Sequence, residues 1–154
     1  MMMIIGMSIK MKSETWLLNP VVSQPIYIDI DVQIVPFIYS FHYTILKMKI
    51  KRLMDIYGEI QVYIRESSSG NTHVKLEFNT VEVFEGLTFY DSLLIRGFLG
   101  DDSKRIRADI QRFYEMQTTE ETDRIFDVKI KDNRVFNAGI WKHLNPIWEG
   151  KIPQ

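Results

Sequence analysis

The sequence predicts an α+β domain in which an antiparallel sheet carries its helices on one face. Four segments alternate apolar and polar residues with a period of two, which is typical of strands with one buried face. The segments between them place apolar residues at helical spacing and end at glycine, which is typical of amphipathic helices. Along the 154 residues the order is strand, helix, strand, strand, helices, strand, the β-α-β-β-α-β arrangement.

The first strand is predicted over residues 26–34, "IYIDIDVQI". Its isoleucines fall on one face, and Asp29 and Asp31 fall on the other. Aspartate is depleted in strands, so this pair of carboxylates suggests a role other than strand formation. After Pro36 the apolar spacing becomes helical and continues to Gly58, which predicts one long helix that stops there.

A β-hairpin is predicted over residues 59–78, because "EIQVYIRE" and "THVKLEF" alternate on either side of the turn sequence "SSSGN". Two helices are then predicted in "TFYDSLLIRGFLG" and "DDSKRIRADIQRFYEM", which meet at Gly100. Helical spacing places Phe89, Leu93, Leu94 and Phe98 on the inward face of the first of these helices.

The last strand is predicted in "RIFDVKI", residues 124–130, with Phe126, Val128 and Ile130 on its buried face. This order of elements is that of ferredoxin-like and RNA-recognition-motif-like folds, in which the four strands lie in space as 4-1-3-2. The first strand would then be central, and helices would cover one face only. The open face would bring together polar residues from three strands: Asp29, Asp31, His73, Lys75 and Asp127.

The bulk properties favour a single domain over residues 1–154, with a core at about 26–130 and extensions at 1–25 and 131–154 that pack on it. Nineteen basic and twenty acidic residues give a net charge of −1, so any nucleic-acid site must be a local patch. The absence of cysteine excludes disulfides, zinc ribbons and thiol chemistry, and we expect an intracellular, cytoplasmic protein. No run approaches the ~18 apolar residues of a membrane span, so no membrane partner is expected.

The acidic pair has the spacing of a metal site. Two carboxylates at i and i+2 of one strand point the same way, and Asp127 on an adjacent strand could complete an oxygen cage for Mg²⁺ or Mn²⁺. Such a cage supports phosphoryl transfer, and a histidine on the next strand could hold a triphosphate. The third carboxylate has three competitors in the sequence: Asp101, Asp102 and Asp109.

Three segments resemble the motifs of the archaeo-eukaryotic primase superfamily, which includes primase-polymerases. "YIDID" has the form of its acidic first motif, "SSSGNTH" that of its turn and histidine, and "FD" in "RIFDVKI" that of its third motif. All three occur in the family's order over roughly residues 26–130. The resemblance implies a minimal catalytic core that transfers nucleotides to a 3′-hydroxyl, with Asp29, Asp31 and Asp127 as metal ligands.

The resemblance also implies a nucleoside triphosphate and a DNA or RNA template as ligands, with a partner subunit or replication protein as a further possibility. Ser69 and His73 would contact the phosphates of the incoming nucleotide, and Arg65 and Lys75 are further nucleotide-binding candidates. A basic cluster around Gly100 is the candidate nucleic-acid contact: Arg96, Lys104, Arg105, Arg107 and Arg112. A basic run on the first helix is interpreted as a solvated face.

Other functions remain open at this point. One is an RNA-recognition-like module that binds nucleic acid without catalysis and stacks bases on Tyr27 and Tyr63. Another is an inactive relative that acts as an interaction protein, its acidic strand being only a solvated face. A rolling-circle nuclease is disfavoured, because that chemistry needs two histidines on one strand and "HVK" supplies only His73.

Overall fold

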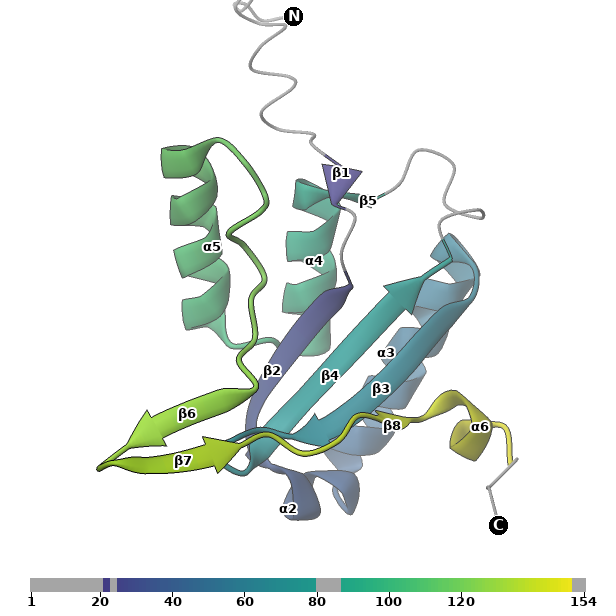
Figure 1. Ribbon diagram of the computed structural model, residues 1–154. Coiled ribbons are helices and arrows are strands. Elements are labelled where there is room, and N and C mark those ends of the chain that lie inside the picture. The colour runs from purple at the N-terminus through teal and green to yellow at the C-terminus, as the bar shows by residue number, and fades with distance from the viewer. Residues whose placement is uncertain (1–20, 23–24, 80–86, 151–154) are drawn as a thin grey trace, which may run out of the picture.

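The computed structural model describes residues 21–22, 25–79 and 87–150, which form a mixed α+β fold around an antiparallel sheet (Figure 1). The sheet has four strands in the order β2-β4-β3-β8. Their bounds are β2 Ile26–Gln33, β3 Ile60–Glu66, β4 Asn71–Phe78 and β8 Lys142–His143. The longest described helix, α3 (Phe41–Tyr57), lies behind this sheet in Figure 1. The α+β class with an antiparallel sheet is therefore confirmed.

The remaining elements surround this sheet. A short helix follows β2 directly, two helices stand beside β2, and a separate hairpin projects beyond its end (Figure 1). Their bounds are α2 Ile34–Ile38, α4 Phe89–Leu99, α5 Ser103–Met116, β6 Val128–Lys131, β7 Arg134–Asn137 and α6 Asn145–Trp148. Two short strands, β1 Val21–Val22 and β5 Leu87–Thr88, pair with each other. The expected packing of residues 1–20, 23–24 and 151–154 lies outside the described residues.

The core forms between the sheet and α3. Alternate residues of the three long strands point to the same face and are buried there against the apolar stripe of the helix. The central contributors are Ile26, Ile28, Ile60, Val62, Val74, Leu76, Leu46 and Ile50. The polar residues of the same strands therefore line the opposite face, where the candidate site lies.

The predicted hairpin turn and the predicted helix ends at glycine are present in the structure. The strands β3 and β4 pair in register on either side of "SSSGN", so the hairpin is confirmed. Gly58 ends α3 with φ 85°, and Gly100 ends α4 with φ 89°. These are left-handed values that glycine adopts without strain. The helix after Pro36 is also present, although a break at Tyr39 and Ser40 separates α2 from α3.

The expected place of the last strand is wrong. Residues 128–131 form β6, which pairs with β7 in a two-stranded sheet of its own. Among the described residues β2 has β4 as its one strand neighbour, so β2 lies at an edge and the order 4-1-3-2 is not confirmed. Phe126, Val128 and Ile130 are exposed rather than buried.

The physical reason is that the outer edge of β2 is already hydrogen-bonded. Tyr27 N donates to Asp123 Oδ2 at 3.0 Å, and Asp29 N donates to Asp101 Oδ1 at 2.7 Å. The carbonyl of Asp29 accepts from the backbone N–H of Asp102 at 3.0 Å. Side chains and a loop amide thus satisfy the groups that a fourth strand would have paired.

The inward face of α4 also differs from the prediction. Phe89 is buried as predicted, but Leu94 and Phe98 are exposed. Ile95 and Leu99 are buried instead, together with Arg96. The helix is turned so that Arg96 meets carboxylates beneath it, and a buried guanidinium is stable only when it is paired in this way. Apolar spacing alone could not predict a buried cation.

Candidate functional site

A cleft of about 670 Å³ opens on the polar side of the sheet, between β2, β4 and α5. One wall is the turn between β3 and β4, and the other is the first half of α5 with residues 121–126. The lining residues are Asp29, Ser67, Ser68, Ser69, Asn71, His73, Asp102, Lys104, Arg105, Ala108, Asp109, Arg112, Glu121, Arg124, Ile125 and Phe126. All three primase-like segments therefore contribute to one cavity, the third through Phe126 rather than through Asp127.

His73 lies at the centre of a row of three polar side chains. Asp29 on β2 is in register with His73 on β4, and His73 is in register with Arg65 on β3. Arg65 Nε donates a hydrogen bond to His73 Nδ1 at 3.1 Å. Since Nδ1 accepts this bond, the proton of a neutral imidazole is on Nε2, which lies 3.8 Å from Asp29 Oδ1.

The protonation state of His73 follows from its surroundings. Burial lowers the pKa of His73 to about 4, and the positive charges of Arg65 and Arg105 lower it as well. The 3.8 Å contact with Asp29 is too long for a hydrogen bond, and a neutral ring makes no ion pair. His73 is thus a neutral residue at pH 7, with an N–H donor that lines the cleft.

Asp29 sits among other acids. Burial raises the pKa of Asp29, and the nearby carboxylates of Asp101, Asp102 and Asp31 raise it as well, whereas Arg105 lowers it. Asp31 lies farther along the strand, is exposed, and accepts a hydrogen bond from Asn71 Nδ2 at 3.1 Å. The strand is irregular between Ile30 and Gln33, so the strict alternation that predicted a side-by-side pair ends there.

The turn that forms one wall is held by its own serines. Ser67 Oγ accepts hydrogen bonds from the backbone N–H groups of Ser69 and Asn71. Gly70 completes the turn with φ 90°, a value that favours glycine. Ser69 remains exposed at the tip, and its hydroxyl contacts Lys129 Nζ at 3.2 Å.

The opposite wall begins at the N-terminus of α5. Asp102 caps the helix, because its side chain accepts from Lys104 N at 2.9 Å. Within the described residues the Lys104 side chain forms no ion pair and is exposed. Arg112 and Arg124 also line the cleft but are paired, with Asp109 and Glu121 respectively. Lys104 is therefore the lining cation most available to an anionic ligand.

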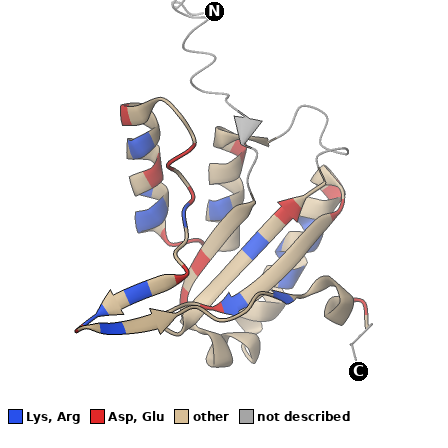
Figure 2. Ribbon diagram, viewed as in Figure 1, with Lys and Arg blue, Asp and Glu red and all other residues tan. Residues whose placement is uncertain are grey.

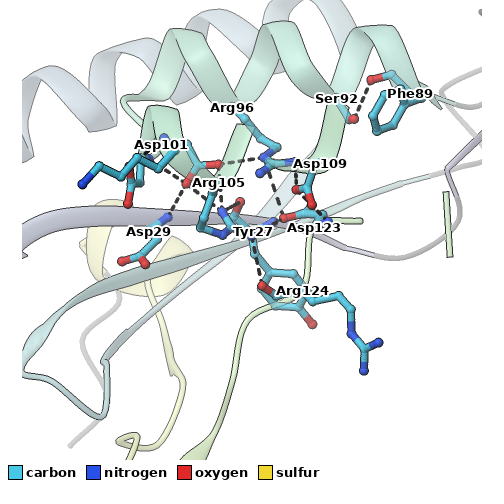
Figure 3. Close-up of polar contacts among 12 residues, drawn as sticks. Tyr27, Asp29, Phe89, Ser92, Arg96, Asp101, Arg105, Asp109, Asp123 and Arg124 are labelled. Atoms are coloured by element: carbon cyan, nitrogen blue, oxygen red, sulfur yellow. Dashed lines mark hydrogen bonds and ion pairs between the residues drawn. The ribbon is translucent and has the colours of Figure 1, made fainter. Parts of the chain in front are cut away.

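Behind this wall lies a buried ion cluster, which Figure 3 shows from β2 to α5. We define it as Arg96, Arg105, Asp101, Asp109 and Asp123. Arg96 contacts Asp101 at 2.7 Å and Asp109 at 2.8 Å, and its side chain has no exposed area. Arg105 contacts Asp101 at 2.7 Å and Asp123 at 2.8 Å. Two cations and three carboxylates therefore fix α4, α5 and residue 123 against the edge of β2.

Trp141 covers part of the open face of the sheet. Its ring lies 4.3 Å from the Arg65 guanidinium carbon and 4.9 Å from Lys75 Nζ. It also lies within 6.4 Å, between ring centroids, of Tyr27 and His73. Tyr63, the other predicted stacking residue, is stacked on His143. The open face is therefore partly occupied by the protein's own aromatic rings.

The structure brings six of the predicted site residues into the cleft: Asp29, Ser69, His73, Lys104, Arg105 and Arg112. The others lie outside its lining. Asp31 is bound to Asn71, Lys75 lies between Tyr63 and Trp141, and Arg107 is exposed on α5. Arg65 stands behind His73 and binds Asp127 through Nη1 at 2.7 Å.

The three competitors of Asp127 as third metal ligand are engaged in contacts that stabilise the fold. Asp101 and Asp109 are buried in the ion cluster, and Asp102 caps α5. The sequence predicted Arg96 as part of a basic cluster that contacts nucleic acid, but its side chain is buried and paired with Asp101 and Asp109. Asp123 and Trp141 were not identified as site residues. An arginine amid apolar residues in "LLIRGF" was the one available signal, because a cation on an apolar helix face needs a buried partner.

These contacts do not match the expected three-carboxylate metal site. Asp127 is 80% exposed at its side chain and is paired with Arg65, and Asp31 is turned to Asn71. Across residues 25–79 and 87–150, no three His, Asp or Glu side chains are grouped as a metal ion requires. Binding of Mg²⁺ or Mn²⁺ stays a prediction for Asp29, Asp31 and Asp127.

In comparison with known proteins, the chain matches no protein-family profile, no curated protein sequence and no solved structure. In the part of the chain that the structure describes, no helix combines the length and apolar character needed to cross a membrane.

Proposed function

We propose that the cleft binds the phosphate groups of a nucleotide, and that the chain is a primase-polymerase-like nucleotidyltransferase. The observation that carries the proposal is the position of His73, a neutral Nε2–H donor that lines the cleft together with Asp29 and the serine turn. Lys104 and the N-terminus of α5 lie on the facing wall. Neutral donors, a cation and a helix N-terminus are the groups that recognise phosphate.

In the proposed reaction the 3′-oxygen of a primer forms a bond to the α-phosphorus of the nucleotide, and pyrophosphate leaves. His73 and Lys104 would hold the leaving phosphates from opposite walls. Asp29 would lie on the side of the attacking hydroxyl. Dependence of this reaction on Mg²⁺ or Mn²⁺ is a prediction, which the titrations with and without MnCl₂ below test. A partner subunit or replication protein likewise stays a prediction.

We further propose that the fold is a ferredoxin-like unit. The strands β2, β3 and β4 with helices α3, α4 and α5 follow the β-α-β-β-α order of a ferredoxin-like unit. The last strand of that unit would be represented by the ion cluster and residues 122–127 along the edge of β2. This assignment is supported by the hydrogen bonds that Asp101 and Asp123 make to that edge.

The proposal is tested by calorimetric titration with ATP and dATP, with and without MnCl₂. We expect the His73→Gln and Lys104→Gln variants each to bind about tenfold more weakly or worse, since a charged hydrogen bond contributes about 1.5–3 kcal/mol. Lys51→Gln removes another exposed lysine, from α3 behind the sheet, and should bind like the wild type. Absence of nucleotide binding by the wild type would contradict the proposal.

A second function is favoured by the ion pair between Arg65 and Asp127. This pair engages the third carboxylate of the expected catalytic set, as in a module that binds nucleic acid without catalysis. Extension of a primed template with labelled nucleotides separates the two functions. Extension that is lost in the Asp29→Asn, Asp31→Asn double variant supports the transferase, whereas nucleotide binding without extension supports the second function.

A further inference from the structure

The hairpin of β6 and β7 lies outside the cleft and differs from the strands of the four-stranded sheet. All eight of its strand residues are exposed. In Figure 1 it projects beyond the end of β2, and Figure 2 shows basic segments on both of its strands. An isolated two-stranded hairpin is at best marginally stable in water, so contact with a partner would stabilise this one.

The register of the hairpin separates its side chains into two faces. Lys129 is paired with Phe136, and Lys131 is paired with Arg134, so these four side chains lie on one face. Val128, Ile130 and Val135 lie on the other. The first face carries three cations and one aromatic ring, and we call it the basic face.

The basic face is connected to the cleft. Lys129 Nζ contacts the hydroxyl of Ser69 at 3.2 Å, at the tip of the serine turn that forms one wall. From there Lys131 and Arg134 continue toward the tip of the hairpin. Lys131 is two strand residues beyond Lys129, so the charged surface extends roughly 7 Å beyond the contact with Ser69.

These cations are free to bind an external anion. Within the described residues neither Lys131 nor Arg134 forms an ion pair, whereas Arg105, Arg112 and Arg124 in the cleft are each paired with a carboxylate. A flexible row of unpaired cations fits a chain of phosphates, because each contact releases a condensed counterion.

Aromatic residues indicate which form of nucleic acid fits. Phe136 shares the basic face and is 39% exposed, and Phe126, which lines the cleft, is 70% exposed. Cations along a backbone with aromatic rings beside them are the elements of single-strand binding, since only unpaired bases can stack on a ring. A duplex would offer phosphates but no free base.

We propose that the basic face of this hairpin binds single-stranded nucleic acid and leads it into the cleft. This inference rests on the proposed function, for which it supplies the site of the template strand. Lys131 and Arg134 contact phosphates, and Phe126 stacks on a base at the mouth of the cavity.

The test is fluorescence anisotropy with a labelled single-stranded oligonucleotide of mixed sequence, measured at several salt concentrations. The Lys131→Gln, Arg134→Gln double variant is compared with Lys51→Gln, Arg52→Gln, which removes two exposed charges from α3. We expect the hairpin variant to bind roughly tenfold more weakly, and the slope of log K against log salt to fall by about 1.4. The α3 variant should bind like the wild type.

A second comparison tests the stacking step. Phe126→Leu should weaken binding of the single strand and leave the weaker binding of a duplex of the same sequence unchanged. Phe41→Leu alters a ring of similar exposure on α3, 73% against 70%, and should have no effect. Equal loss of duplex and single-strand binding in Phe126→Leu would overturn the assignment to single strands.

The two proposals fail in different ways. Unchanged oligonucleotide binding in the hairpin variant, or no binding by the wild type, overturns the hairpin inference while ATP binding still supports the cleft. Strand binding that depends on the hairpin, with no ATP binding by any protein, contradicts the proposed function alone.

Discussion

At the residue scale, the protonation state of His73 is determined by Arg65 and by burial. Arg65 donates to one ring nitrogen, so the other must carry the proton of the neutral ring. Protonation would place a second positive charge beside Arg65 in a position that is only 5% exposed. The folded state therefore favours the neutral form of His73. At acidic pH the tendency of this residue to bind a proton should lower the free energy of unfolding.

The stability of the protein should fall between pH 6.5 and about 4 because of His73. The folded state has a pKa of about 4 at this residue, and the unfolded state has the ordinary value of about 6.5. The unfolded state thus binds the proton first, so the contribution is complete above pH 6.5 and falls by roughly 3 kcal/mol as the pH reaches 4. Urea unfolding at a series of pH values measures this change.

The control for this effect is a histidine in a different environment. His73→Gln should flatten the profile between pH 6.5 and 4, whereas the exposed His42→Gln on α3 should keep the wild-type profile. An unchanged profile in His73→Gln would show that other groups cause the acid sensitivity.

At the element scale, the edge of β2 is closed by side chains instead of by another strand. Asp101 contributes most, because it accepts from Asp29 N with one oxygen and pairs with Arg96 through the other. Arg105 adds to this closure through Nη1, which donates to the carbonyl of Tyr27 at 3.3 Å. The cluster therefore fixes both the helices and the strand that bears the candidate site.

Asp101→Asn should destabilise the protein by about 3–5 kcal/mol, because it leaves the buried Arg96 and the partly buried Arg105 with one carboxylate fewer. Asp55→Asn, at an exposed position on α3, should change the free energy of unfolding by less than about 0.5 kcal/mol. Urea denaturation measures both, and amide hydrogen exchange at Asp29 should accelerate in the first variant. Similar stabilities for the two variants would mean that the cluster contributes little to folding.

At the scale of the whole molecule, the C-terminal segment closes the opposite edge of the sheet. Asn145 accepts from Val62 N at 2.7 Å and donates to the carbonyl of Ile60 at 2.8 Å, so one amide side chain continues the pairing that β8 begins. Trp141, four residues earlier, reaches over the open face to Arg65. The segment thus connects the far edge with the candidate site.

Asn145→Ala should cost about 1–3 kcal/mol, since it leaves a buried N–H and a buried carbonyl of β3 without partners. Asn137→Ala changes an exposed asparagine at the end of β7 and serves as the control. If the segment is released as a unit, the fluorescence of Trp141 should shift toward that of an exposed tryptophan in the first variant. Unchanged stability and fluorescence would show that β8 alone holds the segment.

The sequence predicted the elements whose determinants are local. Alternation, turn residues and helix-stop glycines identified the hairpin of β3 and β4, the helix α3 and the junction at Gly100. The strand order was not predictable in this way, because the bond from Tyr27 N to Asp123 joins residues 96 positions apart. Nothing near "RIFDVKI" indicates that its place beside β2 is already taken.

The sequence predicted the site residues that lie on strands, but not the contacts that distant segments make with them. Asp29 and His73 were placed on one face by the alternation of their strands, and on neighbouring strands by the ferredoxin-like order of elements. Ser69 was added by the resemblance to the primase motifs. Arg65 and Asp127 were predicted to lie near them, but their mutual ion pair depends on where residues 124–127 pass. Trp141 depends on a distant segment and gave no local signal.

The closure of β2 by side chains has a consequence for how this protein can change. A paired strand has a fixed register, and a shift by one residue would turn every side chain to the opposite face. Asp101 and Asp123 do not depend on such a register, because each accepts a hydrogen bond from a different amide of β2, Asp29 N and Tyr27 N respectively. Insertions or deletions within residues 117–121 can therefore be absorbed without reordering the sheet, which makes this stretch the natural place for variants of different length.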